Sequence, residues 1–405
     1  MNNKNIAVMI AAVWVALASS PVLAASGTVS GCVVYNDTRQ ECSAAVGSRR
    51  PCSGANGNKP LREAYVRLSN AGGTGTPGSG TTSSSTGCFS FAWSDAFCWG
   101  FPCSYELVVE LRNPSDFRVR NPSGVQYSNS VTVSVASSNA NLGTFSVGNT
   151  DHAQVYATAN EYWDTIVDGN ATLSARMTDI KIHANTSDAG SYTFDHENIY
   201  LVAGRGSSRP LTTVAHEIGH TTAFKALGRY SIAYTDCNPA HAYLTQSACD
   251  KVAWSEGIAN FFATVWGFTN NAPDSGVTFG TQGGVGVTPA ICNTAAQPWR
   301  VEACQTAALW DLLDDPSADD DVFDDANNIA FGDIIASLDS YISNCTGDRC
   351  DSENGPDAQN HHDFHRAFKC VATGAQVLDL FDVYSSQSLI PGGEEAFSNG
   401  LETCP

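Results

Sequence analysis

Between residues 26 and 149 the chain alternates short runs of β-branched and aromatic residues with segments rich in glycine, proline and serine. Short strands at this spacing are typical of antiparallel sandwiches, so the pattern predicts a β-sandwich. The interval 72–85 is almost wholly Gly, Thr and Ser, which predicts a flexible loop. The expected strands are 28–35, 64–68, 88–93, 105–111 and 130–135.

After residue 151 the pattern changes to apolar residues three and four positions apart. The segment 151–167 is therefore predicted to be helical. Two β-like runs follow, at 179–183 and 198–202, and then further helical segments up to the C-terminus. Because helices and strands are segregated in this way, the sequence predicts an α+β fold with a domain boundary near residue 150, giving domains 26–149 and 150–405.

The N-terminal segment 1–25 carries one lysine, an apolar run at 6–17 and then a small-residue exit, Ser-Ser-Pro-Val-Leu-Ala. This order predicts a secretory signal peptide and hence a secreted protein, extracellular or periplasmic. The apolar run is too short for a membrane span, which needs about 20 residues. The most apolar later segment, 257–268, is interrupted by Asn260 and by glycines, so we expect no membrane partner.

The chain contains 14 cysteines, six before residue 150 and eight after residue 230. An even number in an exported chain predicts disulfides within each region rather than thiolate metal sites. The formal net charge is −20. Nucleic acid and anionic lipid both favour clustered lysine and arginine, so neither is an expected partner.

The motif with the clearest chemistry is His-Glu-Ile-Gly-His, which begins at His216. Pro210 suits the first turn of a helix around this motif, and Gly228 suits its end. On a helix, His216 and His220 lie on one face, one turn apart, so both imidazoles can bind the same metal ion. Glu217 is then the candidate general base.

A catalytic zinc ion generally takes three protein ligands and keeps its fourth position for water. The metzincin arrangement would need Gly at 223 and His at 226, but Ala223 and Ala226 occupy these positions and exclude it. Glu256 offers another solution, because it lies in an apolar, helix-like run at 253–263 where an unpaired charge would be costly to bury. The alternatives for the third ligand are Asp236, His241 and Asp250.

Over roughly residues 151–330 these two motifs resemble the gluzincin zinc peptidases. The resemblance implies a mainly helical zincin-type catalytic domain with a small antiparallel sheet. Asn260, one turn after Glu256, is placed to support a ligand. Glu256 follows His220 by 36 residues, a longer interval than in the thermolysin-like and aminopeptidase branches, so the branch stays open. The resemblance implies these roles: Zn²⁺ ligands His216, His220 and Glu256, and catalytic base Glu217.

The N-terminal region, in turn, resembles the carboxypeptidase regulatory-like, transthyretin-like sandwich through the segments 60–68, 86–91 and 105–109. That resemblance implies an accessory role for domain 26–149, such as tethering substrate or supporting the neighbouring domain. A cleaved pro-region is the alternative interpretation.

The expected mechanism follows from the metal. Zinc lowers the pKa of bound water toward about 7, and Glu217 takes the proton and returns it to the leaving amine. The strand expected at 198–202 falls where gluzincins keep an edge strand that pairs with the substrate backbone. A second donor normally stabilises the oxyanion. The candidates for that donor are His361, His362, His365, Tyr243 and Tyr341.

The aspartate-rich segment 309–325 predicts a solvated acidic loop, with a Ca²⁺ site as the alternative, although its spacing does not match an EF-hand. The function predicted is a secreted zinc peptidase that acts on protein or peptide substrates, an endopeptidase rather than an aminopeptidase. The alternative is a secreted binding or adhesive protein with a vestigial zinc site. Glu217 argues against that alternative, because structural zinc usually has four protein ligands and needs no such carboxylate.

Overall fold

A computed structural model gives the fold of the 405-residue chain. The predicted signal peptide lies outside the described residues, apart from Ala25. The structure describes residues 25–38, 41–42, 52–53, 57–70, 75–96, 98, 102–136, 138–148, 150–203, 212–228, 245–247, 249–269, 292, 295–313, 329–344, 364–365, 367–368, 371–386 and 389.

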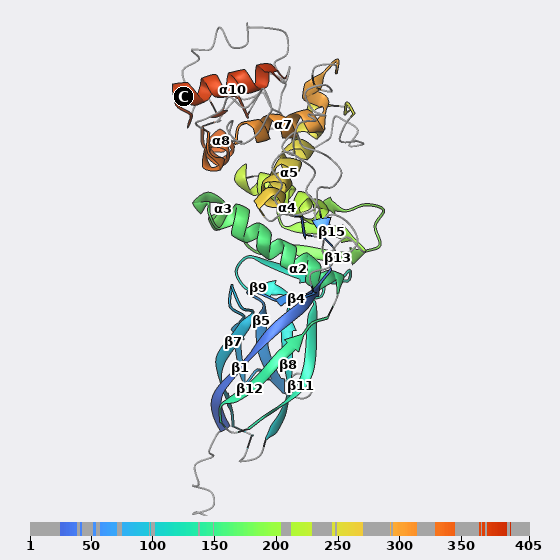
Figure 1. The fold of residues 1–405 in the computed structure, drawn as a ribbon, viewed down its shortest axis with the longest axis vertical. Helices are drawn as coiled ribbons and strands as arrows, with labels where there is room; N and C mark the ends of the chain where they lie inside the picture. Colours follow the sequence, from blue (N-terminus) through green and yellow to red (C-terminus); the bar gives the residue numbers. More distant parts are fainter. Residues whose placement is uncertain are drawn as a thin grey trace, which may run out of the picture. The chain divides into compact units, whose positions relative to one another are not determined.

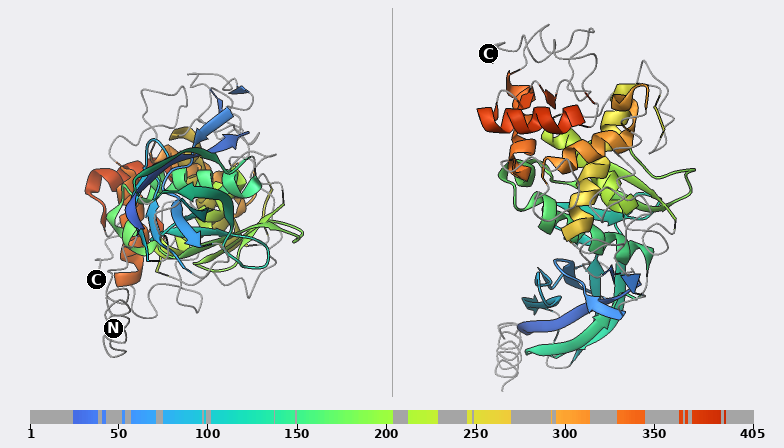
Figure 2. Two further views of the ribbon diagram at one scale, coloured as in Figure 1. Left: turned by 90° about the horizontal axis from the view of Figure 1, so that it is seen from below. Right: turned by 45° about the horizontal axis from the view of Figure 1, so that its top comes forward.

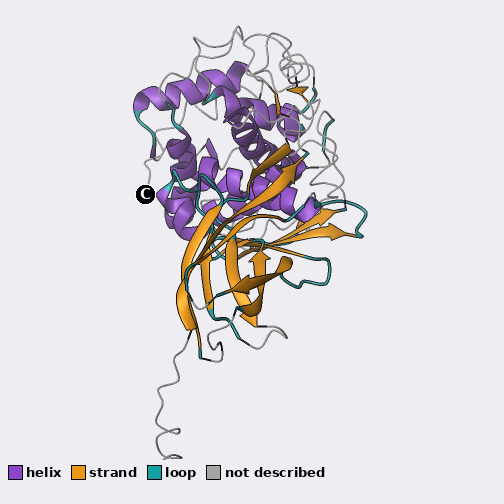
Figure 3. Cartoon of the chain, turned by 60° about the horizontal axis from the view of Figure 1, so that its bottom comes forward, coloured by secondary structure: helices purple, strands orange, loops and turns teal. Residues whose placement is uncertain are grey.

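The chain divides into two compact units (Figure 1). The first comprises Met1–Val34, Pro60–Glu110 and Ser128–Ser146, and the second comprises Tyr35–Lys59, Leu111–Tyr127 and Val147–Pro405. Up to residue 146 the described elements are strands (orange in Figure 3), with these bounds: β1 (Ala25–Asp37), β2 (Glu41–Cys42), β3 (Cys52–Ser53), β4 (Gly57–Pro60), β5 (Tyr65–Asn70), β6 (Gly78–Thr81), β7 (Cys88–Asp95), β8 (Cys103–Glu110), β9 (Arg112–Asn113), β10 (Phe117–Arg120), β11 (Ser128–Val135) and β12 (Ala140–Ser146).

Two sheets supply the strands of the first unit. In one of them β12 and β7 both pair with β1, and the other has the order β11-β8-β5-β6. Buried and exposed positions alternate along β7, as expected for a strand with one face in a core. The two sheets meet where Trp93 packs edge-on against Tyr105, with ring centroids 5.7 Å apart. Disulfides join Cys32 to Cys88 on paired strands and Cys98 to Cys103.

The segment 72–85 differs from the sequence-based expectation of a flexible loop, because Gly78–Thr81 forms strand β6 and pairs with β5. Its glycines serve close packing. A Cβ atom at Gly78 would lie 2.9 Å from the Trp93 Cβ, and one at Gly80 would lie 3.2 Å from the Phe91 Cβ. Glycine here lets β6 approach the aromatic side chains of β7, and composition alone hides this role.

The second unit contains a five-stranded sheet and the described helices (purple in Figure 3). From residue 150 onward the elements are α2 (Asp151–Tyr162), the π-helix η1 (Trp163–Val167), α3 (Ala171–Arg176), β13 (Ile180–Thr186), β14 (Tyr192–Thr193), β15 (Asn198–Val202), α4 (Thr212–Ala226), α5 (Asp250–Thr269), the 3₁₀-helix η2 (Pro298–Arg300), α7 (Glu302–Asp311), α8 (Phe331–Asn344) and α10 (Gly374–Ser386).

The sheet of the second unit has the order β14-β15-β13-β10-β9. Its central strands β10, β13 and β15 are parallel, and only the outer pairs β9–β10 and β14–β15 are antiparallel. The expectation of a small antiparallel sheet was therefore wrong, since the sheet is mixed. Strands β9 and β10 come from residues 112–120, which the sequence pattern assigned to the sandwich segment.

Helix α2 and the π-helix that continues it pack on this sheet. Phe117 of β10 contacts Trp163 and Tyr156, with ring centroids 4.7 and 5.3 Å apart. Tyr162, at the end of α2, shares a 2.8 Å hydrogen bond with Thr222 of α4. The helix predicted at 151–167 is thus present, and its buried aromatic residues link the sheet to α4.

The remaining helices pack around α4 and α5. Helix α7 contacts α5 and α10, and α8 contacts α4 (Figure 2, where α7, α8 and α10 run from orange to red). A disulfide joins Cys292 to Cys304 of α7. Arg176 at the end of α3 donates to the main-chain oxygen of Ala226, 2.8 Å away at the end of α4, and pairs with Asp339 of α8. None of the helices that the structure describes is long and apolar enough to cross a bilayer.

Candidate metal centre

Helix α4 carries the His-Glu-Ile-Gly-His motif through the core of the second unit. Its sequence supports a buried helix, because Val214, Ala215 and Ile218 are fully buried on the faces that do not carry the histidines. The helix ends as predicted near Gly228, which has a φ of +62° and so occupies the left-handed conformation that glycine favours. The other predicted boundary residue, Pro210, lies outside the described residues.

Helix α5 lies directly beside α4 (Figure 1). The close approach depends on glycine at two points. A Cβ at Gly219 would lie 2.7 Å from the main-chain oxygen of Ala259, and a Cβ at Gly257 would collide with Gln305 of α7. Glycine therefore lets three helices approach one another around the histidines, and Glu256 lies at this crossing.

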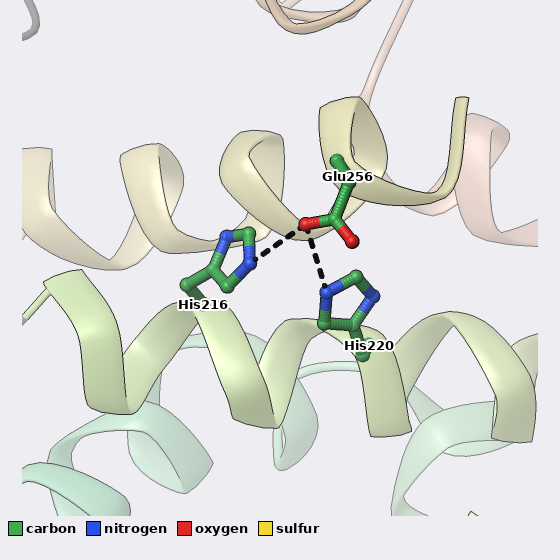
Figure 4. Close-up of side chains that lie close together, drawn as sticks. All are labelled: His216, His220 and Glu256. Atoms are coloured by element: carbon green, nitrogen blue, oxygen red, sulfur yellow. Dashed lines mark hydrogen bonds and ion pairs between the residues drawn. The ribbon is translucent and has the colours of Figure 1, made fainter. Parts of the chain in front are cut away.

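The structure brings His216, His220 and Glu256 together (Figure 4). The Nε2 atoms of the two histidines lie 3.1 and 3.3 Å from the same carboxylate oxygen, Oε2 of Glu256. One donor atom from each residue lies within 4.8 Å of the others, and among the described residues these three form the group that could hold a metal ion. Both imidazoles point from α4 toward the carboxylate on α5.

The second nitrogen of each histidine has a partner on α5. His216 Nδ1 lies 2.9 Å from Asn260 Oδ1, and His220 Nδ1 lies 3.4 Å from Ser255 Oγ. When an imidazole is neutral, donation from Nδ1 leaves the lone pair of Nε2 for a metal, so the contact with Asn260 favours the neutral tautomer of His216 that could bind one. Asn260 thus lies where the sequence placed it, next to a predicted ligand.

Glu217 lies near enough to His216, His220 and Glu256 to feel their charges, and it is only 5% exposed. Its partner is Thr193 of β14, whose Oγ1 donates to the Glu217 carboxylate at 3.0 Å and to its main-chain oxygen at 2.7 Å. Burial raises the pKa of the Glu217 carboxyl, and the neighbouring imidazoles only partly oppose this shift. A carboxylate with a raised pKa is a better proton acceptor than one in water, which suits a general base.

Two further pKa shifts describe the side chains of the site without a metal. Burial lowers the pKa of His216, but the hydrogen bond to Glu256 and the negative charge of that residue outweigh this effect and raise it to about 9. Burial would raise the pKa of Glu256, yet the positive charges and hydrogen bonds of His220 and His216 hold it well below its usual range. Without a metal, His216 is therefore favoured as a positively charged imidazolium and Glu256 as a negatively charged carboxylate.

The donor set fits zinc. Two imidazole nitrogens and one carboxylate oxygen are a ligand set found in catalytic zinc sites, which keep a position open for water. The distances of 3.1 and 3.3 Å between each imidazole nitrogen and the carboxylate oxygen allow both atoms of each pair to lie about 2 Å from an ion. The partners on Asn260 and Ser255 also fix both rings, as expected for metal-binding histidines.

Comparison with known protein families gives a match over about half of the chain. Residues 157–363 match the Mycolysin C-terminal domain, which is more than half of the 405 residues. The chain belongs to the mycolysin family. A search of curated proteins found no match. Mycolysin-family proteins are zinc-dependent metallopeptidases, so this chain is a zinc peptidase with protein or peptide substrates.

The mycolysin match runs from α2 through the region of the His-Glu-x-x-His helix and Glu256. Of the alternative third ligands, Asp250 lies in the first turn of α5 and is not part of the group formed by His216, His220 and Glu256. Asp236 and His241 lie outside the described residues. The matched range thus spans the positions of both motifs on which the sequence-based expectation of a zinc peptidase depended.

Among the candidates for stabilising the oxyanion, the structure describes the side chain of His365 alone. His365 is 6% exposed, and its ring packs edge-on against Tyr384 at 3.8 Å. The side chains of the other candidates, His361, His362, Tyr243 and Tyr341, lie outside the described residues, as does most of the predicted acidic loop at 309–325.

The predicted edge strand 198–202 is not at the edge of the sheet. Strand β15 pairs with β13 on one side and with β14 on the other, so Tyr192–Thr193 is the outer strand among the described residues. The sequence also gave no reason to place Thr193 at the site, because it precedes Glu217 by 24 residues. Ser255 had a weak signal, since it directly precedes Glu256.

Proposed function

We propose that this mycolysin-family chain is a secreted zinc endopeptidase in which His216, His220 and Glu256 bind Zn²⁺ and Glu217 is the general base. The observation that carries the proposal is the convergence of two Nε2 atoms on one carboxylate oxygen, at 3.1 and 3.3 Å, beside a buried glutamate. The N-terminal signal-like segment supports secretion.

In the proposed reaction the metal ion and Glu217 have different roles. Bound zinc would polarise the scissile carbonyl and lower the pKa of water toward about 7. Glu217 accepts a proton from the attacking water and delivers it to the nitrogen of the leaving amine. The raised pKa of Glu217 supports this role, because the same carboxyl must both accept and release the proton near neutral pH.

The position of Asn260 and Ser255 supports the same assignment. Each side chain contacts the Nδ1 atom of one histidine, at 2.9 and 3.4 Å, so both rings keep Nε2 toward Glu256. We infer that this arrangement holds both rings in the orientation that zinc requires before the metal arrives and so reduces the entropy lost on binding. The endopeptidase assignment rests on the sequence, in which we recognise no amine-binding motif.

Casein hydrolysis by the purified protein tests the proposal. We expect a chelator to abolish cleavage and added Zn²⁺ to restore it. The matched variant Glu217→Gln keeps the size of the side chain but cannot accept the proton, so kcat should fall by about 10²- to 10⁴-fold while zinc still binds. Cleavage by the wild-type protein that persists in the chelator would contradict the mechanism. So would cleavage by Glu217→Gln at the wild-type rate.

A further inference from the structure

Thr193 links the outer strand of the sheet to the helix that carries the predicted base. Its Oγ1 lies 2.7 Å from the main-chain oxygen of Glu217 and 3.0 Å from the carboxylate Oε2 of the same residue. We propose that Thr193 is a positioning residue for Glu217, which holds Oε2 so that Oε1 remains free to exchange a proton with water. The inference rests on the proposed function.

Hydrogen bonds in the hairpin hold the backbone next to Thr193. The N–H of Phe194 donates to the main-chain oxygen of Asn198 at 2.9 Å. In the turn between the two strands, Asp195 is 3% exposed, and its Oδ1 accepts from the N–H groups of Glu197 and Asn198 at 2.7 and 2.8 Å. The Thr193 hydroxyl therefore contacts Glu217 from the end of strand β14, next to a turn that is held by its own hydrogen bonds.

A hydrogen-bond donor at a fixed position is useful to Glu217, because its side chain has several rotatable bonds. Its proposed function depends on the position of the carboxylate oxygen that accepts the proton. Proton transfer requires the acceptor within hydrogen-bond reach of the water, and misplacement by about 1 Å can cost roughly 100-fold in rate. A hydrogen bond to Oε2 restricts the carboxylate to the orientations that keep this contact. The helix backbone alone places the Cα of Glu217 but not its carboxylate.

Thr193 neither gains nor loses a proton in the proposed reaction. The proton passes from the water oxygen to Oε1 of Glu217 and then to the leaving nitrogen, while the Thr193 hydrogen stays on its own oxygen. That single hydrogen has two acceptors, the carboxylate and the main-chain oxygen of Glu217. A structural role would use only the bond to the main-chain oxygen, which fastens β14 to α4, whereas positioning requires the bond to the carboxylate.

The test compares Thr193→Val, which has nearly the shape of threonine but no hydroxyl, with Thr193→Ser, which keeps the hydroxyl. In the zinc-loaded enzyme we expect Thr193→Val to lower kcat by about 10- to 100-fold with little change in KM, and Thr193→Ser to retain most of kcat. Zinc affinity, measured by competition with a chromophoric chelator, should stay at the wild-type value in both. Crystal structures should show one orientation of Glu217 in Thr193→Ser and several in Thr193→Val.

The matched control is Thr222→Val, which removes a threonine hydroxyl from α4, the helix that carries Glu217. Thr222 is fully buried and bonded to Tyr162 and to the main-chain oxygen of Ile218, so its loss should lower stability and leave kcat unchanged. If Thr193→Val does not fold, Thr193→Ala takes its place, with the same expected loss of kcat. Wild-type kcat in the hydroxyl-free variant, or a single unchanged orientation of Glu217, would overturn the inference.

The proposed function fails in a different way from this inference. If the wild-type protein shows no zinc-dependent cleavage, or if Glu217→Gln is fully active, the catalytic assignment itself is wrong. If the wild-type protein is active, Glu217→Gln is inactive and Thr193→Val keeps the wild-type kcat, then only the role of Thr193 is refuted.

Discussion

His216 Nδ1 lies 2.9 Å from the side-chain oxygen of Asn260, one helical turn beyond Glu256 on α5. A single helix therefore supplies both a predicted metal ligand and the group that orients another ligand. Because α4 and α5 lie side by side, the two helices form one rigid frame for the site.

Removing the Asn260 side chain should weaken zinc binding without unfolding the protein. Asn260→Ala leaves His216 free to rotate and to change tautomer, so we expect zinc affinity to fall by about 10- to 100-fold. Asn260→Asp keeps an acceptor oxygen and should bind zinc at least as tightly as Asn260→Ala. Competition with a chromophoric chelator measures both. Equal affinities of Asn260→Ala and the wild type would refute the orienting role.

Zinc binding should release protons in a pH-dependent way. In the metal-free protein Glu256 raises the pKa of His216 to about 9, so this imidazole is protonated at pH 7. Zinc binds only the neutral form, and binding at pH 7 should therefore release about one proton from His216. The release should diminish as pH rises through 9, while the apparent affinity increases up to that pH.

Calorimetry in two buffers of different ionisation enthalpy measures this proton release. NMR titration of the His216 ring in the metal-free protein supplies an independent value of the pKa. A release that is already absent at pH 7, together with an unshifted His216 titration, would show that Glu256 does not act on this imidazole as its distance implies.

A methyl group at Gly257 should disturb the packing between α5 and α7. The added Cβ would collide with Gln305 and lie 3.1 Å from the main-chain oxygen of Glu302. Overpacking of this kind costs about 1–3 kcal/mol, which exceeds the gain of up to about 1 kcal/mol in helix propensity. We expect Gly257→Ala to unfold at a lower urea concentration and to bind zinc more weakly.

Gly332 in α8 supplies the matched control, since a Cβ there would meet no atom within 4 Å. Gly332→Ala should keep or increase the stability of the protein and leave zinc binding unchanged. Similar urea midpoints for the Gly257 and Gly332 variants would mean that α5 and α7 can separate without cost, contrary to the packing described above.

The disulfide between Cys292 and Cys304 should stabilise the helical unit. The two residues are 12 positions apart and fully buried, and closing a loop of about this length contributes roughly 3 kcal/mol in the chain-entropy account. The double variant Cys292→Ala and Cys304→Ala should therefore unfold at a lower temperature. Calorimetry of the oxidised proteins measures the difference, and equal midpoints would contradict it.

Much of the secondary structure followed from local patterns. The expected strands around Val66, Phe91 and Leu107 and the helix that carries His216 appear where the sequence placed them. Alternation and helical spacing are properties of neighbouring residues, so a short window of sequence contains them. Strand β6 was one of the strands that the pattern did not predict, because Gly78 and Gly80 are suited to close packing against the aromatic side chains of another strand.

The pairing between strands was harder to predict from the sequence. The pattern around Phe117 gave no indication that β10 joins the sheet of the second unit beside Ile180 of β13. Parallel neighbours are brought together by long connections, and nothing in the local spacing of residues identifies the partner. The strand expected at the sheet edge proved internal for the same reason, since the short strand at Tyr192 covers it.

By itself the sequence determined that two imidazoles share one helix face, because His216 and His220 are one turn apart in any helix. It also marked Glu256 as a buried carboxylate in need of a partner. Only the tertiary structure decided that this carboxylate lies about 3 Å from both rings and that Thr193 contacts Glu217. These contacts join residues 24 to 40 positions apart, and their distances depend on how whole helices and strands pack.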